Sequence, residues 1–455
     1  MKINIKEQNR ERMPLEQQFE KVISPLQAFI HSQSSAGVLL LLATAIALFL
    51  ANSTWHAEYT ELTNFRIGFI WGNEQFYHSA VEWVNEGLIV IFFFLLGLEI
   101  KYECIAGELK EIKSSLFAIS LAIGGMLFPA LTYLISMSLL GGDNWQGWGI
   151  VMATDTAFSL GLLVLLGSRV PSSVLVLITA LAIVDDIGAV LVISLFYTDN
   201  IAMVQLGYGA MVLFMMFLAN VLGIRAVWFY LISSLFLWWF VSHSGVHATT
   251  AGVLAALTVP TKPLADTHWF ARSMESLLTR FKKIDRTDKT IMDQQHQHEL
   301  VEKAEVIAKS VTTPVQRWQS KLYQPISFFV LPLFALLNAG IVLPESTGEI
   351  MSAPVFLSCL FGLLIGKPLG IFLFAYLTVR LGWADKPKDM QWSDFLAMGC
   401  FAGIGFTMSL FIANLAFVDM LATIEYAKLG IICGSVLSAA LGFLLFLKNK
   451  PVAKR

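Results

Sequence analysis

Two adjacent aspartates, Asp185 and Asp186, stand in the apolar stretch "ALAIVDDIGAV". From Ser172 to Thr198 no other residue is charged. An isolated carboxylate is strongly disfavoured in an apolar environment, so it has to pair with a cation, bind a metal ion or take up a proton. The aspartate pair therefore indicates chemistry with protons or small cations.

Two more ionisable residues stand at the centres of other apolar stretches: Asp155 in "MATDTAFSLG" and Lys367 in "LLIGKPLG". Ionisable groups inside a membrane are costly and usually functional. Neighbouring helical residues point about 100° apart, so one aspartate of the pair can meet Lys367 while the other faces a water-filled cavity. A purely structural ion-pair cluster is the alternative, but three acids against one base would leave it unbalanced.

The composition indicates that a membrane protein positions these residues. Of the 455 residues, 56% are hydrophobic and only 14% are charged, and the mean hydropathy is +0.67. Such values are typical of a polytopic membrane protein. The net charge of -2 gives no indication of nucleic-acid binding. The four scattered cysteines are interpreted as small buried hydrophobes rather than metal ligands or disulfides: Cys104, Cys359, Cys400 and Cys433.

Apolar stretches of membrane-spanning length predict an all-α fold with about twelve transmembrane helices. We expect them at 34–52, 80–100, 116–139, 146–167, 172–197, 203–222, 226–241, 245–260, 324–341, 354–378, 394–417 and 427–447. The N-terminus lacks the basic region and apolar core of a signal peptide, so the first span should stay in the mature protein. If both termini are cytoplasmic, all 31 Lys and Arg except Arg66, Lys367 and Lys428 lie in inside segments. This agrees with the positive-inside rule.

The spans divide into a first membrane bundle at 34–260, of about eight helices, and a second at 324–447, of about four. Cytoplasmic tails at 1–33 and 448–455 flank them. An outer β-hairpin is expected at about 64–78, around Gly72 and Asn73. The polar segment 261–323 holds 11 Lys and Arg and is interpreted as a cytoplasmic loop. Two histidines close together in it, His296 and His298, are too few ligands to indicate a metal site.

Two of the spans have interrupted helical patterns. Thr154, Asp155 and Thr156 lie in the middle of the fourth span, while Gly403, Gly405 and Thr407 lie in "FAGIGFTMSL" of the eleventh. Two glycines close together weaken a helix and mark a break. Interrupted helices at corresponding positions are typical of transporters built from inverted-topology repeats, here spans 3–5 and 10–12, with the site at the midplane where they cross.

These stretches resemble the NhaA-type bacterial sodium/proton antiporters. The matching motifs are, in the family's order, "FFFLLGLEIK", "IGGMLFPAL", "ATDTAFSLG", "LLGSRVP", "ALAIVDDIGA", "SGVHAT", "LPLFALLNAG", "LLIGKPLG", "GIGFTMSLFI" and "AKLGIICGS". Together they are highly specific and cover the chain from about residue 34 to 447.

The resemblance implies a role for individual residues. Asp186 corresponds to the main sodium ligand, Asp185 to the partner of Lys367, and Thr154 with Asp155 to the unwound part of the fourth span. Glu99 in "GLEIK" matches an acid of the cytoplasmic funnel that is linked to pH response. Before "LPLFA", where the family often has further acids and histidines, this chain has Ser320, Lys321 and Gln324. The outer hairpin matches the element through which the family forms homodimers.

We therefore expect a secondary antiporter of the bacterial inner membrane, which exports Na+ or Li+ from the cytoplasm in exchange for external H+. The resemblance implies pH regulation, and shared carboxylates imply an electrogenic cycle that moves more protons than sodium ions. Neither an enzyme activity nor a cofactor is expected. An intramembrane aspartyl protease also has two buried aspartates, but it needs them on separate helices. A cation channel would favour rings of identical groups across subunits. A proton-coupled solute carrier would need a larger polar pocket, which the sequence does not indicate.

Overall fold

The computed structural model describes residues 33–71, 74–107, 110, 112–198, 201–284, 295–342, 347–418 and 420–448. Within these ranges nearly every element is a helix, and a two-stranded antiparallel sheet is the exception. The fold is therefore all-α, as the apolar stretches predicted. Most of the N-terminal tail, most of the C-terminal tail and the turn residues Gly72 and Asn73 lie outside the described residues.

The first bundle contains a helix, or a chain of helical segments, at each expected span. Its elements are α2 (Gln33–Ala51), α3 (His56–Asn64), α4 (Ala80–Glu82), η2 (Trp83–Leu88), α5 (Ile89–Ala106), α6 (Ile112–Leu139), η4 (Trp145–Val151), α7 (Thr156–Leu165), η5 (Gly167–Arg169), α8 (Ser172–Phe196), α9 (Met203–Val221), α10 (Val227–Ser242) and α11 (Ala248–Thr258).

The second bundle likewise contains helical segments at each expected span. Its elements are α14 (Pro314–Pro325), η7 (Ile326–Val330), α15 (Leu331–Asn338), α16 (Thr347–Ser352), α17 (Pro354–Phe361), η8 (Gly362–Gly366), α18 (Lys367–Arg380), α19 (Trp392–Ala402), α20 (Phe406–Ala416) and α21 (Leu421–Leu447). Segments η2, η7 and η8 are π-helical turns inside longer helices. Such turns are rare and often occur at functional sites.

By length and composition, six helices among the described residues can cross a membrane, or up to nine if each bent pair counts as one span. The remaining expected spans are α5, α10 and α11. The last turns of α5 carry Glu99, Lys101 and Glu103. Helix α11 has only 11 residues, so it extends about half the thickness of the hydrocarbon core. The chain is thus a multi-pass membrane protein whose eighth span is shorter than the expected 245–260.

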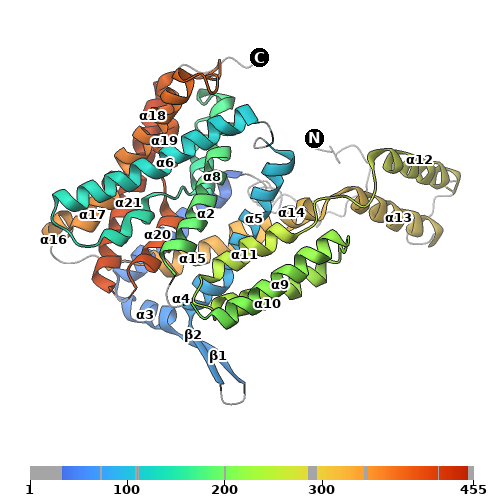
Figure 1. Cartoon of the computed structure of the whole chain (residues 1–455), viewed down its shortest axis with the longest axis horizontal. Helices are drawn as coiled ribbons and strands as arrows, with labels where there is room; N and C mark the ends of the chain where they lie inside the picture. Colours follow the sequence, from blue (N-terminus) through green and yellow to red (C-terminus); the bar gives the residue numbers. More distant parts are fainter. Residues whose placement is uncertain are drawn as a thin grey trace, which may run out of the picture.

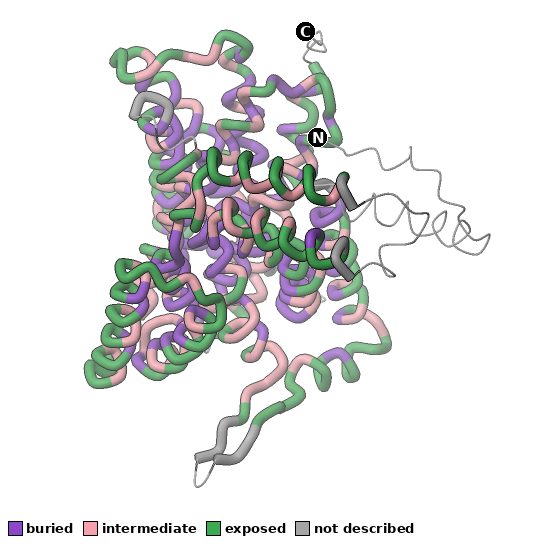
Figure 2. Tube along the Cα trace, turned by 90° about the vertical axis from the view of Figure 1, so that its right-hand side faces the viewer, coloured by how far each residue is buried: buried purple, intermediate pink, exposed green. Residues whose placement is uncertain are grey.

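The helices form two adjoining groups (Figure 1). Helices α6, α8 and α17–α21 gather on one side, and α9, α10, α11 and α14 lie on the other. Helices α6 and α18 pack so closely that a Cβ on Gly370 would collide with the backbone oxygen of Gly124. Buried residues lie mainly in the interior of the helical body (Figure 2).

The outer hairpin forms from β1 (Arg66–Trp71) and β2 (Glu74–Ser79), paired in antiparallel register from Arg66 opposite Ser79 to Trp71 opposite Glu74. It projects beyond the helical body in Figure 1. The indole nitrogen of Trp83 donates to the Ile67 carbonyl at 2.8 Å. The base of the hairpin is therefore anchored to η2.

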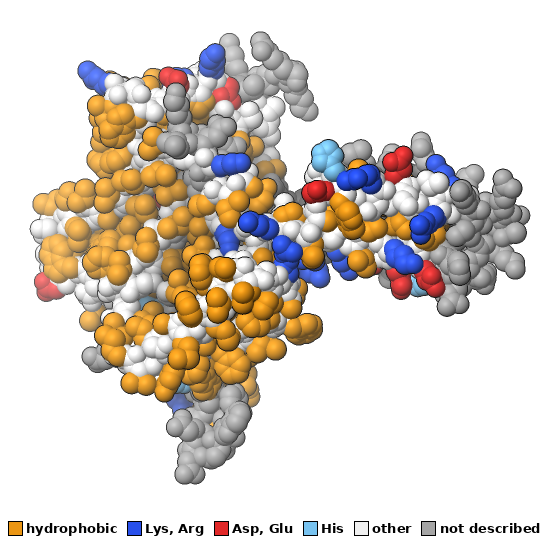
Figure 3. Space-filling view, turned by 45° about the vertical axis from the view of Figure 1, so that its right-hand side comes forward, with side chains coloured by type: hydrophobic (Ala, Val, Ile, Leu, Met, Phe, Trp, Pro, Cys, Tyr) orange, Lys and Arg blue, Asp and Glu red, His pale blue; other side chains and the backbone are white. Residues whose placement is uncertain are grey.

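The segment 261–323 differs from the expected linker because much of it is helical. Helices α12 (Thr267–Ile284) and α13 (Gln295–Val311) pack against each other and stand out from the body (Figure 3). Helix α14 then begins the ninth span at Pro314, ten residues before the expected start at 324. His298 pairs with Glu302 at 3.4 Å, and the side chain of His296 lies outside the described residues.

Candidate functional site

The two interrupted spans cross at their breaks. The pair η4 and α7 is bent by 41° and the pair α19 and α20 by 51°. At the crossing the backbone N–H of Asp155 donates to the Ile404 carbonyl at 2.7 Å. Both breaks lie where the sequence predicted them, so backbone groups that a continuous helix would satisfy are released at one point inside the protein.

Asp155 satisfies the N-terminal ends of two half-helices at once. Its Oδ1 accepts from the backbone N–H of Phe158 at 3.1 Å and so caps α7. Its Oδ2 accepts from the backbone N–H of Thr407 at 3.1 Å and from the Thr407 hydroxyl at 2.7 Å, at the start of α20. A carboxylate suits this position because helix N-termini carry partial positive charge.

Lys367 and Asp185 form an ion pair that is fully buried, with Nζ and Oδ2 3.0 Å apart. The ammonium also donates to the carbonyl of Met152, just after η4. The hydroxyl of Thr154 lies 2.8 Å from the same Asp185 oxygen and 3.0 Å from the Ala402 carbonyl at the end of α19. Lysine and threonine thus bind the C-terminal side of the breaks, where partial negative charge accumulates.

Asp186 differs from its neighbour in its position at a cavity. It is 3% exposed, and its Oδ1, like the Oδ1 of Asp185, has no hydrogen-bond partner among the described residues. Together with Thr154, Asp155 and Thr407 it lines a cavity of about 360 Å³. Buried polar atoms normally have partners. A buried carboxylate oxygen without one, beside other oxygen donors, suits a proton or a hard cation such as Na+.

The same cavity extends to the end of α5, where Glu99, Tyr102 and Glu103 line it. Opposite them, Gln319 on α14 together with Tyr323 and Ser327 lines the cavity at spacings of four residues. From the sequence, Ser320, Lys321 and Gln324 were expected at this position of the funnel. The lining residues are their neighbours instead, because α14 continues the ninth span and presents one face of a helix.

Gly403 and Gly405 permit close packing around the break of the eleventh span. A Cβ on Gly403 would collide with the Leu363 carbonyl, and a Cβ on Gly405 would lie 3.1 Å from the Ala153 carbonyl. Neither glycine has a positive φ. Gly403 therefore permits close packing against η8, and Gly405 permits close packing against the break of the fourth span; neither serves a left-handed turn.

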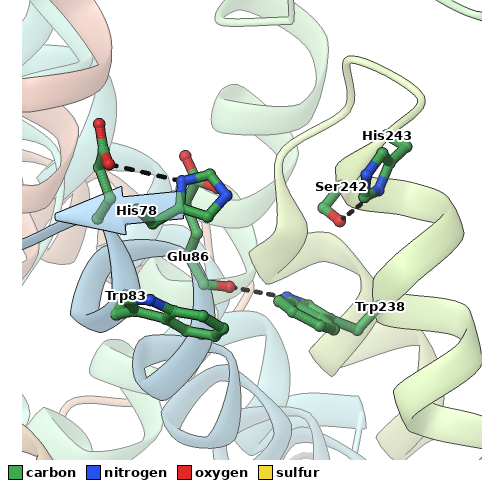
Figure 4. A pocket seen from close by; sticks show the side chains of 8 residues that line it. His78, Trp83, Glu86, Trp238, Ser242 and His243 are labelled. Atoms are coloured by element: carbon green, nitrogen blue, oxygen red, sulfur yellow. Dashed lines mark hydrogen bonds and ion pairs between the residues drawn. The ribbon is translucent and has the colours of Figure 1, made fainter. Parts of the chain in front are cut away.

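A second, smaller pocket of about 100 Å³ lies at the start of the second span, between β2, η2 and α10 (Figure 4). The indole of Trp238 donates to the Glu86 carbonyl at 2.7 Å, and His78 lies 3.5 Å from Glu82. His243 lies on the opposite wall. In the described part of the chain no group of three or more His, Cys, Asp or Glu has the geometry for a metal ion.

Comparison with known proteins agrees with the resemblance noted in the sequence. The family described as Na+/H+ antiporter 1 matches residues 27–446, which is nearly the whole chain. The chain belongs to this family of Na+/H+ antiporters.

Named relatives of this antiporter are similar over more than nine tenths of their length. A Na(+)/H(+) antiporter NhaA 1 of Pseudoalteromonas atlantica is 49% identical over 447 residues, covering 98% of this chain and 94% of the relative. A protein of the same name from Saccharophagus degradans is 40% identical, covering 94% and 92%. A solved sodium proton antiporter, MjNhaP1 of Methanocaldococcus jannaschii, is 15% identical to this chain. The match covers 96% of each chain and has a TM-score of 0.46.

The structure of this antiporter brings together most of the residues predicted for the site. Glu99 shares one cavity with Asp186, while Asp185 and Lys367 lie in the packed interior behind it. The sequence analysis missed Ser159, whose hydroxyl donates to the Phe401 carbonyl at 2.7 Å and so binds the end of α19. It also missed Tyr323. A helix extended to Pro314 would have identified Tyr323, whereas a lone serine in an apolar span gave no signal.

Proposed function

We propose that the antiporter exports Na+ or Li+ from the cytoplasm in exchange for external H+ at a site centred on Asp186. The observation that carries this proposal is the partnerless Asp186 oxygen, buried beside the oxygens of Thr154, Asp155 and Thr407 on one cavity. Sodium is a hard cation that oxygen ligands satisfy. A proton on Asp186 would displace it, so one site serves both ions.

The neighbouring ion pair supplies the second proton of the proposed cycle. Asp185 is held by Lys367 at 3.0 Å, and it takes up a proton when that pair separates. Two acids then release protons as one monovalent cation binds, so each cycle moves net positive charge inward. An inside-negative potential favours that direction by about 2.3 kcal/mol per charge per 100 mV. Exchange in liposomes that ignores an imposed potential would contradict the two-proton cycle.

Glu99 is proposed as the residue that links transport to cytoplasmic pH. It lines the same cavity as Asp186 from the last turns of α5, with Glu103 on the same wall. Protonation of an acid at this mouth changes the local potential for an entering cation. The role follows from the resemblance together with this position. Exchange by Glu99→Gln with an unchanged pH profile would argue against it.

The positive charges support a bacterial inner-membrane topology with both termini in the cytoplasm, because the segments between spans alternate in their content of Lys and Arg. We further propose that α6–α8 and α17–α21 are inverted-topology repeats. Each contains a broken helix flanked by two longer ones, an arrangement for which NhaA is a known example.

The test is sodium-induced collapse of a pH gradient in everted membrane vesicles, scanned over pH and repeated with Li+. Asp186→Asn keeps the side-chain size but cannot exchange a proton for a cation, so exchange should be lost while the protein still inserts. Asp394→Asn is the matched control: Asp394 is 2% exposed but caps α19 away from the cavity. Normal exchange by Asp186→Asn would refute the site.

A further inference from the structure

The cavity that reaches Asp186 ends against two layers of side chains on its outer side. Three helical segments build these layers. From the cavity outward, each segment carries a cavity-lining residue, then a phenylalanine and then an asparagine. On α15, Leu331 lines the cavity, Phe334 lies about one turn further, and Asn338 ends the helix. On α20 the order is Thr407, Phe411 and Asn414.

The third segment is the second span, which runs from η2 into α5. Here Leu96 lines the cavity, Phe93 lies one turn further out, and Asn85 lies in η2 beyond it. Helical spacing puts Asn85 and Leu96 about 16 Å apart along the axis. The three segments therefore present a phenylalanine layer above the cavity and an asparagine layer above the phenylalanines.

The phenylalanine layer is closed. Phe93, Phe334 and Phe411 are at most 3% exposed. Ring centroids of Phe93 and Phe411 lie 5.7 Å apart, and those of Phe334 and Phe411 lie 6.3 Å apart. Aromatic rings at these separations are in contact. An ion cannot pass from Asp186 to the outer side between these three helices unless the rings separate.

The asparagine layer is joined by side-chain amides. Asn85 and Asn338 exchange two hydrogen bonds, of 3.0 and 2.9 Å. Asn414 donates to the Asn338 oxygen at 2.9 Å. The second donor bond of Asn338 goes to the Phe334 carbonyl at 3.0 Å. All four hydrogen-bonding positions of the Asn338 amide are thus occupied, which makes this arrangement specific for asparagine.

We propose that Asn85, Asn338 and Asn414 form a latch that holds the outer side closed while the cavity is open to the other side. This inference rests on the proposed exchange, because a transporter that works by alternating access must open a path on each side in turn. Such a path past Phe411 requires α20 to separate from α5 and α15. That movement breaks the bond between Asn414 and Asn338, so the latch contributes to the balance between the two states.

The experiment measures accessibility with two reporter cysteines, in a chain with Cys104→Ser and Cys433→Ser. Ala335→Cys and Leu331→Cys are one turn apart on α15; Leu331 faces the cavity, and Ala335 is fully buried beside Phe334. Asn414→Ala should speed labelling of Ala335→Cys by an impermeant thiol reagent from the outer side, by about tenfold. Labelling of Leu331→Cys from the cytoplasmic side should slow, because the inward-open population falls.

The matched control is Asn220→Ala. Asn220 donates to the Thr258 carbonyl at 2.8 Å and joins α9 to α11, away from the three layers. The latch would be overturned if Asn414→Ala left the labelling of both cysteines unchanged. It would also be overturned if Asn414→Ala and Asn220→Ala accelerated the labelling of both cysteines equally. If Asn414→Ala fails to insert, Asn414→Leu must give the same opposite changes, because it keeps the side-chain size but cannot donate to Asn338. Labelling does not require transport. If the antiporter and all its variants lacked exchange, the proposed function would be refuted, but the labelling rates would still test the latch.

Discussion

At the scale of single residues, the two adjacent aspartates have different partners because a helix turns by about 100° per residue. Asp185 faces Lys367 and Thr154 in the packed interior, whereas Asp186 faces the cavity. Helix geometry alone permitted this division without saying which aspartate pairs with Lys367, and the family resemblance supplied that assignment. In the structure the ion pair is indeed made by Asp185.

The buried ion pair gives a stability prediction. Lys367→Ala leaves the Asp185 charge without its cation, a loss that costs about 3–5 kcal/mol when one partner of a buried pair is removed. We expect a lower thermal unfolding temperature in detergent. The second substitution, Asp185→Asn, should restore part of the loss, because it removes the uncompensated charge. Strictly additive losses in the two single variants and the double variant would show that the residues do not interact.

At the scale of elements, the site depends on helix ends rather than on helix faces. Asp155 binds the starts of α7 and α20, and Lys367 and Thr154 bind the ends of η4 and α19. These contacts replace the backbone hydrogen bonds that the breaks remove. The breaks can stay open inside the protein because each end has a hydrogen-bonding partner: a carboxylate at the starts of α7 and α20, an ammonium at the end of η4 and a hydroxyl at the end of α19.

Gly403 tests how tightly the break of the eleventh span packs against η8. In Gly403→Ala the new Cβ meets the Leu363 carbonyl, so we expect a loss of about 1–3 kcal/mol, as for other overpacked interiors. Gly207→Ala on α9 is the matched control, because no atom lies within 4 Å of its Cβ. There the substitution should be neutral or stabilising. Equal thermal unfolding temperatures for the two variants would mean that the contact between Gly403 and η8 tolerates a side chain.

The elements that could be predicted from sequence are those with strong local signals. Both breaks were found because Gly403 with Gly405 and Thr154 with Asp155 are unusual inside apolar spans. The start of the ninth span at Pro314 was missed because α14 is polar, and hydropathy does not detect a helix that continues beyond the membrane. The three π-helical turns were not expected either, since their cause lies in packing and not in composition.

At the scale of the whole molecule, the asparagine layer could not be predicted. Asn85, Asn338 and Asn414 are far apart in the chain, and each is an ordinary polar residue in its own span. Only the packing of η2, α15 and α20 brings them together. The charged residues of the site were easier to find, because a charge in an apolar span is informative without any tertiary contact.

The outer hairpin gives a prediction about assembly. Strands β1 and β2 project from the helical body, and the ion site lies within one chain. If the hairpin joins two copies, replacing Arg66–Ser79 by a short Gly-Ser linker should convert a dimer into a monomer without abolishing exchange. Mass measurement in detergent distinguishes the two states. A shortened chain that remains dimeric would place the contact elsewhere.

The central claim is that Na+ and H+ compete for the carboxylates at the cavity, and the apparent Na+ affinity of the purified antiporter at several pH values tests it most directly. Acidification protonates the ligands, and a protonated carboxyl is a poor sodium ligand. The apparent dissociation constant should therefore rise as pH falls, by about tenfold per pH unit for each competing proton. A sodium affinity that stays the same from acid to alkaline pH would contradict the shared site.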